Sequence, residues 1–343
     1  MMGLAGAKRN KCPRSLSPFE IEGQRHDGDN LTNPVLVAWY DFNDNSEDLM
    51  FSYESGFTDQ IEDGQRLGLI HNKVYKNIRD NGAPGDLDKA LFRYMLGISG
   101  TMAPYWHAPT DSTRGFVRFD GSGNALFGGG TTPSITGSAS SSTIDMNDFM
   151  IVVVAKKDDS LTGVRQNLFT LYPKSGTQLL VLSFDTNDTL NMQSVDSGGA
   201  TAIKIMSMND ADDGEFRYYY INAYPSFAGA TTAMNMQSDG FFNHVTASYN
   251  KLSFTAAQTS TMEFDGVSSN MFTGLGCTKA SGAGVFPNLS SGLFKGDIYE
   301  LMIFKKDMDG GATTFTDPEA GKRTHRDIVQ YLRKKYRYVR NDG

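Results

Sequence analysis

The sequence predicts an all-β protein, either an antiparallel sandwich or a barrel. Short segments rich in β-branched and aromatic residues recur along the chain, for example Val35 to Phe42 and Phe149 to Ala155. Gly-rich turns and Asp-Gly pairs such as Asp120-Gly121 separate these segments. Helical periodicity is almost absent before residue 310, which excludes parallel α/β folds. The sequence has no repeat of 20–50 residues, which argues against a solenoid or a propeller.

The composition favours one large folded domain with an N-terminal arm. Hydrophobic residues make up 39% of the 343 residues and charged residues 21%, with 36 Gly and 22 Phe, which is a globular and turn-rich mixture. We place the arm at residues 1–33 and the domain at residues 34–343. The net charge of −7 argues against nucleic acid as a main partner. There is no secretory signal and no apolar run near the roughly 20 residues that span a bilayer, so we expect no membrane span and synthesis in the cytoplasm.

The arm carries basic residues among Gly, Ser, Pro and Asn, with almost no periodic apolar pattern. Two interpretations are open: an extended segment that docks on a neighbouring subunit, or simple disorder. For the first, the candidate subunit contacts in the arm are Lys8, Arg9, Lys11 and Arg14. The two cysteines, Cys12 and Cys277, are far apart and share no motif, so we expect two free thiols.

The strands and turns of the domain can be placed approximately. Residues 116–121 and 125–127 indicate a strand, a tight Asp-Gly turn and a second strand. Residues 128–143 and 226–240 are expected to be loops, and residues 87–95 a brief helix. Further strands are expected over 35–42, 67–71, 149–155, 168–172, 178–184, 216–224, 243–249 and 261–264.

The stretch from Phe294 to Phe304 is the strongest strand signal. By strict alternation, Tyr299, Leu301 and Ile303 point to one side of the strand and Ile298, Met302 and Phe304 to the other. Both sets are apolar, and Glu300 is the only charge between Ile298 and Phe304. Such a strand needs cover on both faces, so we expect a packed sheet on one side and the following helix on the other.

That helix is predicted over residues 317–337. Thr316-Asp-Pro-Glu319 gives a capping box with Pro in the first turn, and Ile328, Val329, Leu332 and Tyr336 form a narrow apolar stripe. The opposite face is basic, and it is either a solvated face or a contact with an acidic neighbour. The candidate subunit contacts on this face are Arg326, Arg333, Lys334 and Lys335.

Several of these segments resemble a known family. AWYDFND at residues 38–44, DGQRLG at 63–68, Tyr105 and VRFDGSGNALF at 117–127 look like the opening of concanavalin A-like jelly-roll domains of the laminin-G-like type. FKGDIYELMIF at 294–304 followed by IVQYLRKKY at 328–336 is similar to the terminal strand and helix of that family in virion proteins of tailed bacteriophages. The resemblance covers residues 35–338, although the middle third matches only by strand pattern. It implies a two-sheet jelly-roll sandwich without implying sugar binding, because this fold hosts hydrolases, lectins and structural modules.

No arrangement of residues in the sequence predicts catalysis, a metal site or a cofactor. Glu263 and Asp265 are the nearest to a glycosidase carboxylate pair, but Asp265-Gly266 indicates a turn and no third carboxylate follows. The acidic turns at residues 185–188 and 210–214 lack a full calcium-loop pattern. If a sugar were bound, Tyr105, Trp106 and His107 would be the stacking candidates, with buried packing as their other role.

We therefore expect a non-enzymatic virion structural protein of a tailed phage, made in the host cytoplasm and located in the virion. It would be a surface or head decoration, or a tail component. Its partners would be other virion proteins, and we expect the chain to be oligomeric or bound to the particle. The alternative is a carbohydrate-binding module that contacts host-surface glycans through residues 101–115 or 226–240, and a glycoside hydrolase is a remote third.

Overall fold

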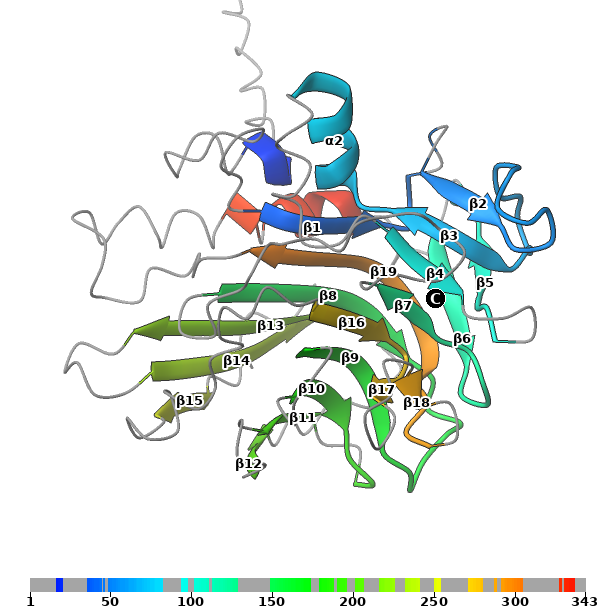
Figure 1. Ribbon diagram of the computed structural model, residues 1–343. Helices are drawn as coiled ribbons and strands as arrows, with labels where there is room; N and C mark the ends of the chain where they lie inside the picture. Colours follow the sequence, from blue (N-terminus) through cyan, green and yellow to red (C-terminus); the bar gives the residue numbers. More distant parts are fainter. Residues whose placement is uncertain are drawn as a thin grey trace, which may run out of the picture.

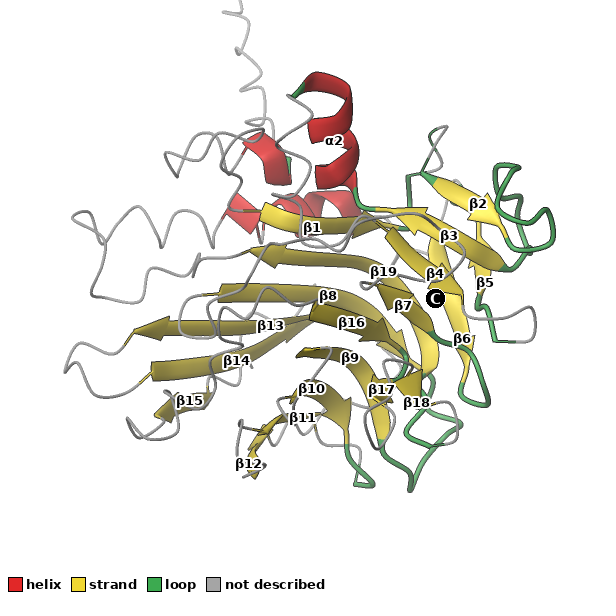
Figure 2. Cartoon of the chain, viewed as in Figure 1, coloured by secondary structure: helices red, strands yellow, loops and turns green. Residues whose placement is uncertain are grey.

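Figure 1 shows a computed structural model of the chain. The residues that the structure describes are 17–20, 36–44, 46, 49–82, 94–97, 102–110, 113–128, 149–173, 179–187, 190–195, 201–206, 216–225, 232–240, 250–253, 271–279, 287–288, 291–304, 327–328 and 330–336. Among these residues the chain forms two large sheets that pack face to face, with helices beside one of them (Figures 1 and 2). The fold is an all-β, two-sheet antiparallel sandwich, as the sequence predicts.

Sheet A has eight strands, all paired in antiparallel fashion. Its long strand β19 pairs with β8 along one side, while β6 and β1 share the other side end to end. This arrangement brings the first and last described strands into direct contact. The sheet runs in the order β15 (Asn250–Ser253), β14 (Thr232–Gly240), β13 (Phe216–Pro225), β8 (Phe149–Lys157), β19 (Lys295–Phe304), β6 (Phe116–Asp120) and β5 (Tyr105–His107), with β1 (Leu36–Asp41) paired to β19.

Sheet B has nine strands and is also antiparallel throughout. Its order is β12 (Thr201–Met206), β11 (Leu190–Val195), β10 (Leu179–Phe184), β9 (Gln166–Pro173), β16 (Met271–Leu275), β7 (Leu126–Gly128), β4 (Tyr94–Gly97), β3 (Leu67–His71) and β2 (Met50–Ser52). A separate short ladder joins β17 (Thr278–Lys279) to β18 (Pro287–Asn288). Helix α2 spans Lys73–Asn81, and residues 327–328 and 330–336 are helical and belong to the predicted C-terminal helix.

The main core lies between the two sheets. Strands β19 and β8 of sheet A contribute Ile298, Leu301 and Val153 to it, and Leu171 and Leu182 of sheet B face them. These side chains are fully buried. Burial of apolar area stabilises a protein by about 25 cal/mol per Å², so this shared interior is the main source of stability.

A β-bulge in β19 changes the predicted alternation. The register against β8 shifts between Ile298 and Glu300, so Tyr299 is an extra residue on this strand. As a result Ile298 lies in the core between the sheets, while Tyr299 packs on the outer side of sheet A. The strict alternation that the sequence suggested is therefore wrong at these two positions, although both faces of the strand are buried as expected.

The helices cover the outer face of sheet A beside β1. Figure 2 shows them gathered there. Met302 and Phe304 of β19 pack with Ile328 and Leu332 of the C-terminal helix in one buried cluster. The prediction that the helix covers the second face of β19 is confirmed. Val74 and Ile78 of α2 belong to the same cluster.

Helix α2 was not expected from the sequence. Its N-cap is Asn72, whose side-chain oxygen accepts a hydrogen bond from Val74 N at 2.9 Å. The same side chain also accepts from Trp39 N and donates to Val37 O, each at 3.0 Å, so it ties the helix to β1. The buried side chains of the helix stand four residues apart, a spacing too brief to give a clear periodic signal.

Three other local predictions differ from the structure. The turn at Gly121 exists, with φ +74°, but β6 belongs to sheet A and β7 to sheet B, so the chain crosses between the sheets there instead of forming a hairpin. Residues 232–240 form strand β14 and are not a loop, since polar and small residues are compatible with a ladder between β13 and β15. Tyr94 and Met95 lie in β4 and not in a helix, because β3 and β7 flank them. The predicted strands over 243–249 and 261–264 lie outside the described residues.

Part of the predicted arm lies on the domain itself. Residues 18–20 form a helical turn that begins with a capping box: Ser17 N donates to Glu20 Oε2 at 2.8 Å, and Glu20 N donates to Ser17 Oγ at 3.3 Å. The Phe19 ring meets the Trp39 ring edge-on at 5.1 Å between centroids. The rest of residues 1–33 lies outside the described residues.

Candidate functional site

A groove on the outer face of sheet A is the candidate binding site. It has a volume of about 700 Å³ and lies over β5, β6 and the start of β19, bordered by residues 158–160 that follow β8. Trp106, Val117 and Phe119 point into the core, so the residues that alternate with them along β5 and β6 point outward. The groove is therefore built by the polar positions of strands whose other side holds the sandwich together. Its lining includes Tyr105, Arg118, Lys156, Asp158, Lys295 and Asp297.

An ion pair across two strands fixes part of the groove wall. Arg118 on β6 donates to both carboxylate oxygens of Asp297 on β19, from Nε at 2.8 Å and from a terminal nitrogen at 3.0 Å. This two-point hydrogen bonding raises the pKa of the Arg118 guanidinium further. The Arg118 side chain is 53% exposed, so one side of the guanidinium faces the solvent. Two residues before Asp297 on the same strand, Lys295 lies 3.5 Å from Asp158.

Two aromatic side chains beside these charges are held in fixed positions. The hydroxyl of Tyr105 accepts hydrogen bonds from Arg66 at 2.8 and 3.1 Å. His107 stacks on Phe116 with 4.7 Å between ring centroids. Burial and the nearby Arg118 charge lower the pKa of His107, so the ring is neutral at pH 7. Tyr105 and His107, two of the predicted stacking residues, therefore lie on the outer face, where Arg66 holds Tyr105 and the Phe116 ring covers one face of His107.

Trp106 has a different position from its two neighbours. Its side chain is 0% exposed and belongs to the core between the sheets. The indole Nε1 donates to Phe42 O at 2.8 Å, which ties β5 to the end of β1. A buried ring offers no face to a sugar, so the structure gives Trp106 the packing role that the sequence left open beside stacking. Sequence reasoning missed Arg118 and Asp297, which the alternation of FVRFD along β6 and the polar position directly before Ile298 in β19 could have indicated.

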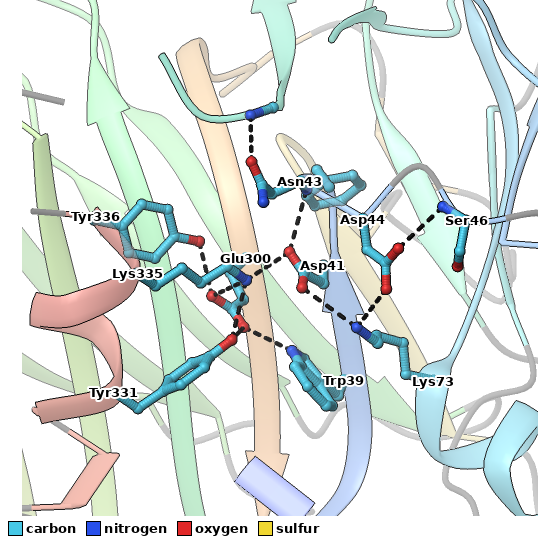
Figure 3. Close-up of polar contacts among 12 residues, drawn as sticks. Trp39, Asp41, Asn43, Asp44, Ser46, Lys73, Glu300, Tyr331, Lys335 and Tyr336 are labelled. Carbon is cyan, nitrogen blue, oxygen red and sulfur yellow. Dashed lines mark hydrogen bonds and ion pairs between the residues drawn. The ribbon is translucent and has the colours of Figure 1, made fainter. Parts of the chain in front are cut away.

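A second polar cluster is buried under the C-terminal helix (Figure 3). Its centre is Glu300, which is 0% exposed and accepts four hydrogen bonds. Trp39 Nε1 donates at 2.6 Å, the hydroxyls of Tyr331 and Tyr336 at 2.8 and 2.7 Å, and Lys335 Nζ at 3.0 Å. Three of these four donors come from the C-terminal helix, so Glu300 is a structural partner of that helix. Below, the Glu300 cluster means these five residues together with Asp41, Asp44 and Lys73.

The other half of the Glu300 cluster links β1 to α2. Lys335 Nζ lies 2.6 Å from Asp41 Oδ1, and Lys73 Nζ lies 3.4 Å from Asp41 Oδ2 and 2.7 Å from Asp44. Burial by itself would raise the pKa of Asp41, but the charges of Lys335 and Lys73 outweigh it and hold this pKa below its usual value. Burial would likewise lower the pKa of Lys73, and Asp41 and Asp44 raise it instead. Glu300 and Asp41 are register partners on β19 and β1, so the strand pairing itself places the two carboxylates side by side.

The predicted subunit contacts differ in how exposed they are, and some of them lie outside the described residues. Lys335 was expected on the basic face opposite the apolar stripe, but its side chain is only 12% exposed and is bound to Asp41 and Glu300. The reason is spacing: Lys335 is seven residues after Ile328 and three after Leu332, which puts it on the buried side of the helix. Lys334 is exposed and Arg333 half-buried. Lys8, Arg9, Lys11, Arg14 and Arg326 lie outside the described residues.

The glycosidase and calcium candidates of the sequence lie mostly outside the described residues. Glu263 and Asp265 lie outside them, as do Asp188 and residues 210–214. The described part of the chain has no group of three or more His, Cys, Asp or Glu residues placed to hold a metal ion. Cys277 is a free buried thiol as expected, and burial raises its pKa to about 12. No helix among the described residues is long and apolar enough to cross a membrane.

Comparisons with known proteins give only distant likenesses. No protein family matches the sequence, and no curated protein matches it. Among solved structures, the CBM40 of the Ruminococcus gnavus IT-sialidase aligns with a TM-score of 0.33 and 13% identity, over 52% of this chain and 83% of that one. The CBM2 module of the evolved Dit of Lactobacillus casei BL23 phage J-1 aligns with a TM-score of 0.33 and 13% identity, over 78% of this chain and 94% of that one. A SAP-like pentraxin from Limulus polyphemus aligns with a TM-score of 0.33 and 8% identity, over 53% of this chain and 72% of that one. Likenesses at these scores do not carry a function from one protein to another.

Proposed function

We propose that the chain is a non-enzymatic structural protein of a tailed-phage virion, built on a concanavalin A-like jelly roll of the laminin-G-like type. It would sit on the particle surface as a head decoration or belong to the tail. One observation carries this proposal: the strand and helix whose sequences resemble the ending of such virion proteins pack together as a unit, with Met302 and Phe304 against Ile328 and Leu332. The Glu300 cluster locks this unit to β1 and α2.

The charge distribution supports an adhesive role. Within the described residues, the charged groups of the interior are engaged inside the molecule: Asp41 and Glu300 bind lysines that come from helices. Buried charges that are paired in this way hold elements together. The segment before Ser17 carries four basic residues and no acidic one, which suits contact with an acidic neighbour.

Particle association tests the proposal. The protein should be found by mass spectrometry in purified virions of the phage that encodes it, and a reconstruction of the particle should show the two-sheet sandwich on its surface. Deleting residues 1–16 should abolish particle association while leaving a folded sandwich. The deletion stops before Ser17 because the turn at residues 18–20 packs on Trp39 through Phe19.

A matched variant separates the charge of the arm from its presence. Replacing Lys8, Arg9, Lys11 and Arg14 by Ala should weaken particle association nearly as much as the deletion if charge drives the contact. Lys334→Ala changes an exposed candidate contact on the C-terminal helix and tests the helix separately, because it should leave particle association unchanged if the arm alone is the anchor. Unchanged occupancy by the deletion variant would refute the arm as anchor, and absence of the chain from purified virions would refute the virion role.

The groove over β5 and β6 favours a second candidate, a carbohydrate-binding module for host-surface glycans. The specific observation is Tyr105, which lines the groove while Arg66 hydrogen-bonds its hydroxyl and lies over one face of its ring. Aromatic faces suit pyranose rings, and the alternating charges of Arg118, Asp297 and Lys295 can hydrogen-bond sugar hydroxyls. The groove contains both signs of charge, so a neutral or zwitterionic sugar fits it better than a polyanion.

A glycan array with the full chain tests this candidate. Binding should be lost in Tyr105→Ala and kept in the control Tyr53→Ala, which removes a half-buried aromatic ring from the edge of sheet B. Trp106→Ala is unsuitable as a probe because it would empty a site in the core. If the intact protein gives no signal with any glycan, the groove is not a sugar site.

A further inference from the structure

In the Glu300 cluster, the Lys335 amine lies between two buried carboxylates, those of Asp41 and Glu300 (Figure 3). Lys335 Nζ lies 2.6 Å from Asp41 Oδ1 and 3.0 Å from Glu300 Oε2. All three are inside the protein, with exposed fractions of 12% for Lys335, 6% for Asp41 and 0% for Glu300. An amine, a carboxyl group and a second carboxylate that contacts the amine are thus held together away from solvent.

We propose that Lys335 and Asp41 condense to an intramolecular amide, a covalent bond between the side chains of the C-terminal helix and β1. The bond forms between Nζ of Lys335 and Cγ of Asp41, and Glu300 is the general base for the step. The proposal is independent of the virion role, because it concerns only groups within one chain.

The atoms balance without any other reactant. Glu300 takes a proton from the Lys335 ammonium, and the free amine attacks Cγ of Asp41 to give a tetrahedral intermediate. A second proton leaves the nitrogen as the C–Oδ1 bond breaks, and Oδ1 departs as water carrying both protons. The ammonium and carboxylate charges disappear together, and the products are one amide and one water molecule. Glu300 ends as the carboxylate that it was at the start.

Neighbouring groups support this direction of attack. The N–H of Asn43 donates to Asp41 Oδ1 at 3.1 Å and fixes the carboxylate beside the Lys335 amine. Lys73 lies 3.4 Å from Asp41 Oδ2, where negative charge develops in the intermediate. Lys73 is itself held by Asp44 at 2.7 Å. Asp41 therefore has the Lys73 ammonium beside Oδ2, the oxygen that stays in the amide. The Lys335 nitrogen, which supplies protons, lies beside Oδ1, the oxygen that leaves.

The surroundings favour the amide over the ion pair. Two groups held in contact react with effective concentrations on the order of 10⁵–10⁸ M, which can overcome the unfavourable condensation in water. Burial of two charges is costly, and their replacement by a neutral amide removes that cost. Trp39 and Tyr336 are 5% and 1% exposed and shield the site from the water that would reverse the reaction.

The chain offers an internal comparison. Lys76 and Asp80 on α2 also stand 2.6 Å apart, but their side chains are 27% and 37% exposed. Among the described residues their ion pairs are with each other and with Arg79, so no second described carboxylate is paired with the amine. Water reaches the exposed Lys76–Asp80 pair, and no described carboxylate is placed to take a proton from Lys76. We therefore expect no amide between Lys76 and Asp80, although their atoms are as close as those of Lys335 and Asp41.

Mass spectrometry of the intact full-length protein tests the proposal. The purified chain should weigh one water molecule less than its sequence, and it should keep this difference after unfolding in denaturant. Digestion with trypsin should yield a branched peptide that joins the segment containing Asp41 to the one containing Lys335, with no cleavage after Lys335. A full sequence mass after prolonged incubation of the folded protein, with normal cleavage after Lys335, would overturn the proposal.

Variants assign the roles. Lys335→Arg keeps the positive charge without a nucleophilic amine, and Glu300→Gln keeps both reacting groups without the base, so each should restore the full sequence mass. The control Lys334→Arg, at the exposed neighbouring position, should lose one water like the natural chain. A Glu300→Gln protein that is folded by circular dichroism and still loses water would remove Glu300 as the base. Because the natural chain alone decides whether the bond exists, a variant that fails to fold does not affect the main result.

Discussion

Removal of one hydroxyl from the Glu300 cluster gives a sharp test of how the C-terminal helix is held. Tyr336 is 1% exposed, and its hydroxyl donates to Glu300 Oε2 at 2.7 Å. Tyr336→Phe removes this donor while keeping the ring in the apolar cluster with Tyr299 and Leu332. A hydrogen bond to a charged group contributes about 1.5–3 kcal/mol. Lys335 still donates to the same oxygen, so the carboxylate keeps a partner, and we expect a loss of about 2 kcal/mol in the free energy of unfolding.

The assay is urea denaturation followed by tryptophan fluorescence, because Trp39 contacts Glu300 directly. The midpoint should fall while the slope of the transition stays the same, since the surface exposed on unfolding does not change. Tyr53→Phe is the matched control, a half-buried tyrosine at the edge of sheet B, and it should leave the midpoint unchanged. A loss of less than about 0.5 kcal/mol in Tyr336→Phe would refute the view that hydrogen bonds to Glu300 hold this helix.

Three further predictions follow from single contacts. The lowered pKa of Asp44 stabilises the fold fully above its ordinary value of 3.8, so stability measured by urea denaturation should fall as the pH drops through and below that value; stability that is flat across this range would contradict the pairing of Asp44 with Lys73. Gly276→Ala should cost about 2 kcal/mol or more by thermal denaturation, because φ is +75° there and a Cβ would strike the Phe119 ring; a neutral effect would contradict the backbone conformation. Trp106→Phe should cost about 1–3 kcal/mol, because it leaves Phe42 O without its indole donor, and full retention of stability would argue against the buried hydrogen bond.

The sequence is sufficient to predict an element where its residue types are compatible with only one environment, such as apolar residues that must be buried. Two apolar faces on the stretch that became β19 require cover from both sides, and the structure supplies sheet B on one side and the helices on the other. The pairing of β9 with β10 was also predictable, because both strands are apolar and only residues 174–178 separate them in the sequence. A turn signal such as Asp120-Gly121 specifies a reversal of the chain but not the strand on the far side, so the change of sheet between β6 and β7 could not be predicted.

Prediction of the candidate sites needed tertiary contacts more than prediction of the strands did. Tyr105 and His107 were named from their residue types, and the structure places both on the outer face of β5. Trp106 belongs to the same segment, but the alternation of the strand turns it into the core. Arg118 and Asp297 are 179 residues apart in the chain, and only the pairing of β6 with β19 brings them together.

The Glu300 cluster separates what the sequence determines from what only the tertiary structure decides. The sequence by itself determined an all-β fold, a doubly buried last strand and a helix after it, because alternation, β-propensity and helix capping are local properties of the chain. Only the tertiary structure decided that a β-bulge places Tyr299 beside Glu300 on the outer face, that Asp41 is its register partner and that Lys335 turns inward to both. The physical reason is that a buried charge is stabilised by partners from distant segments, and strand register, which no single segment specifies, selects those partners.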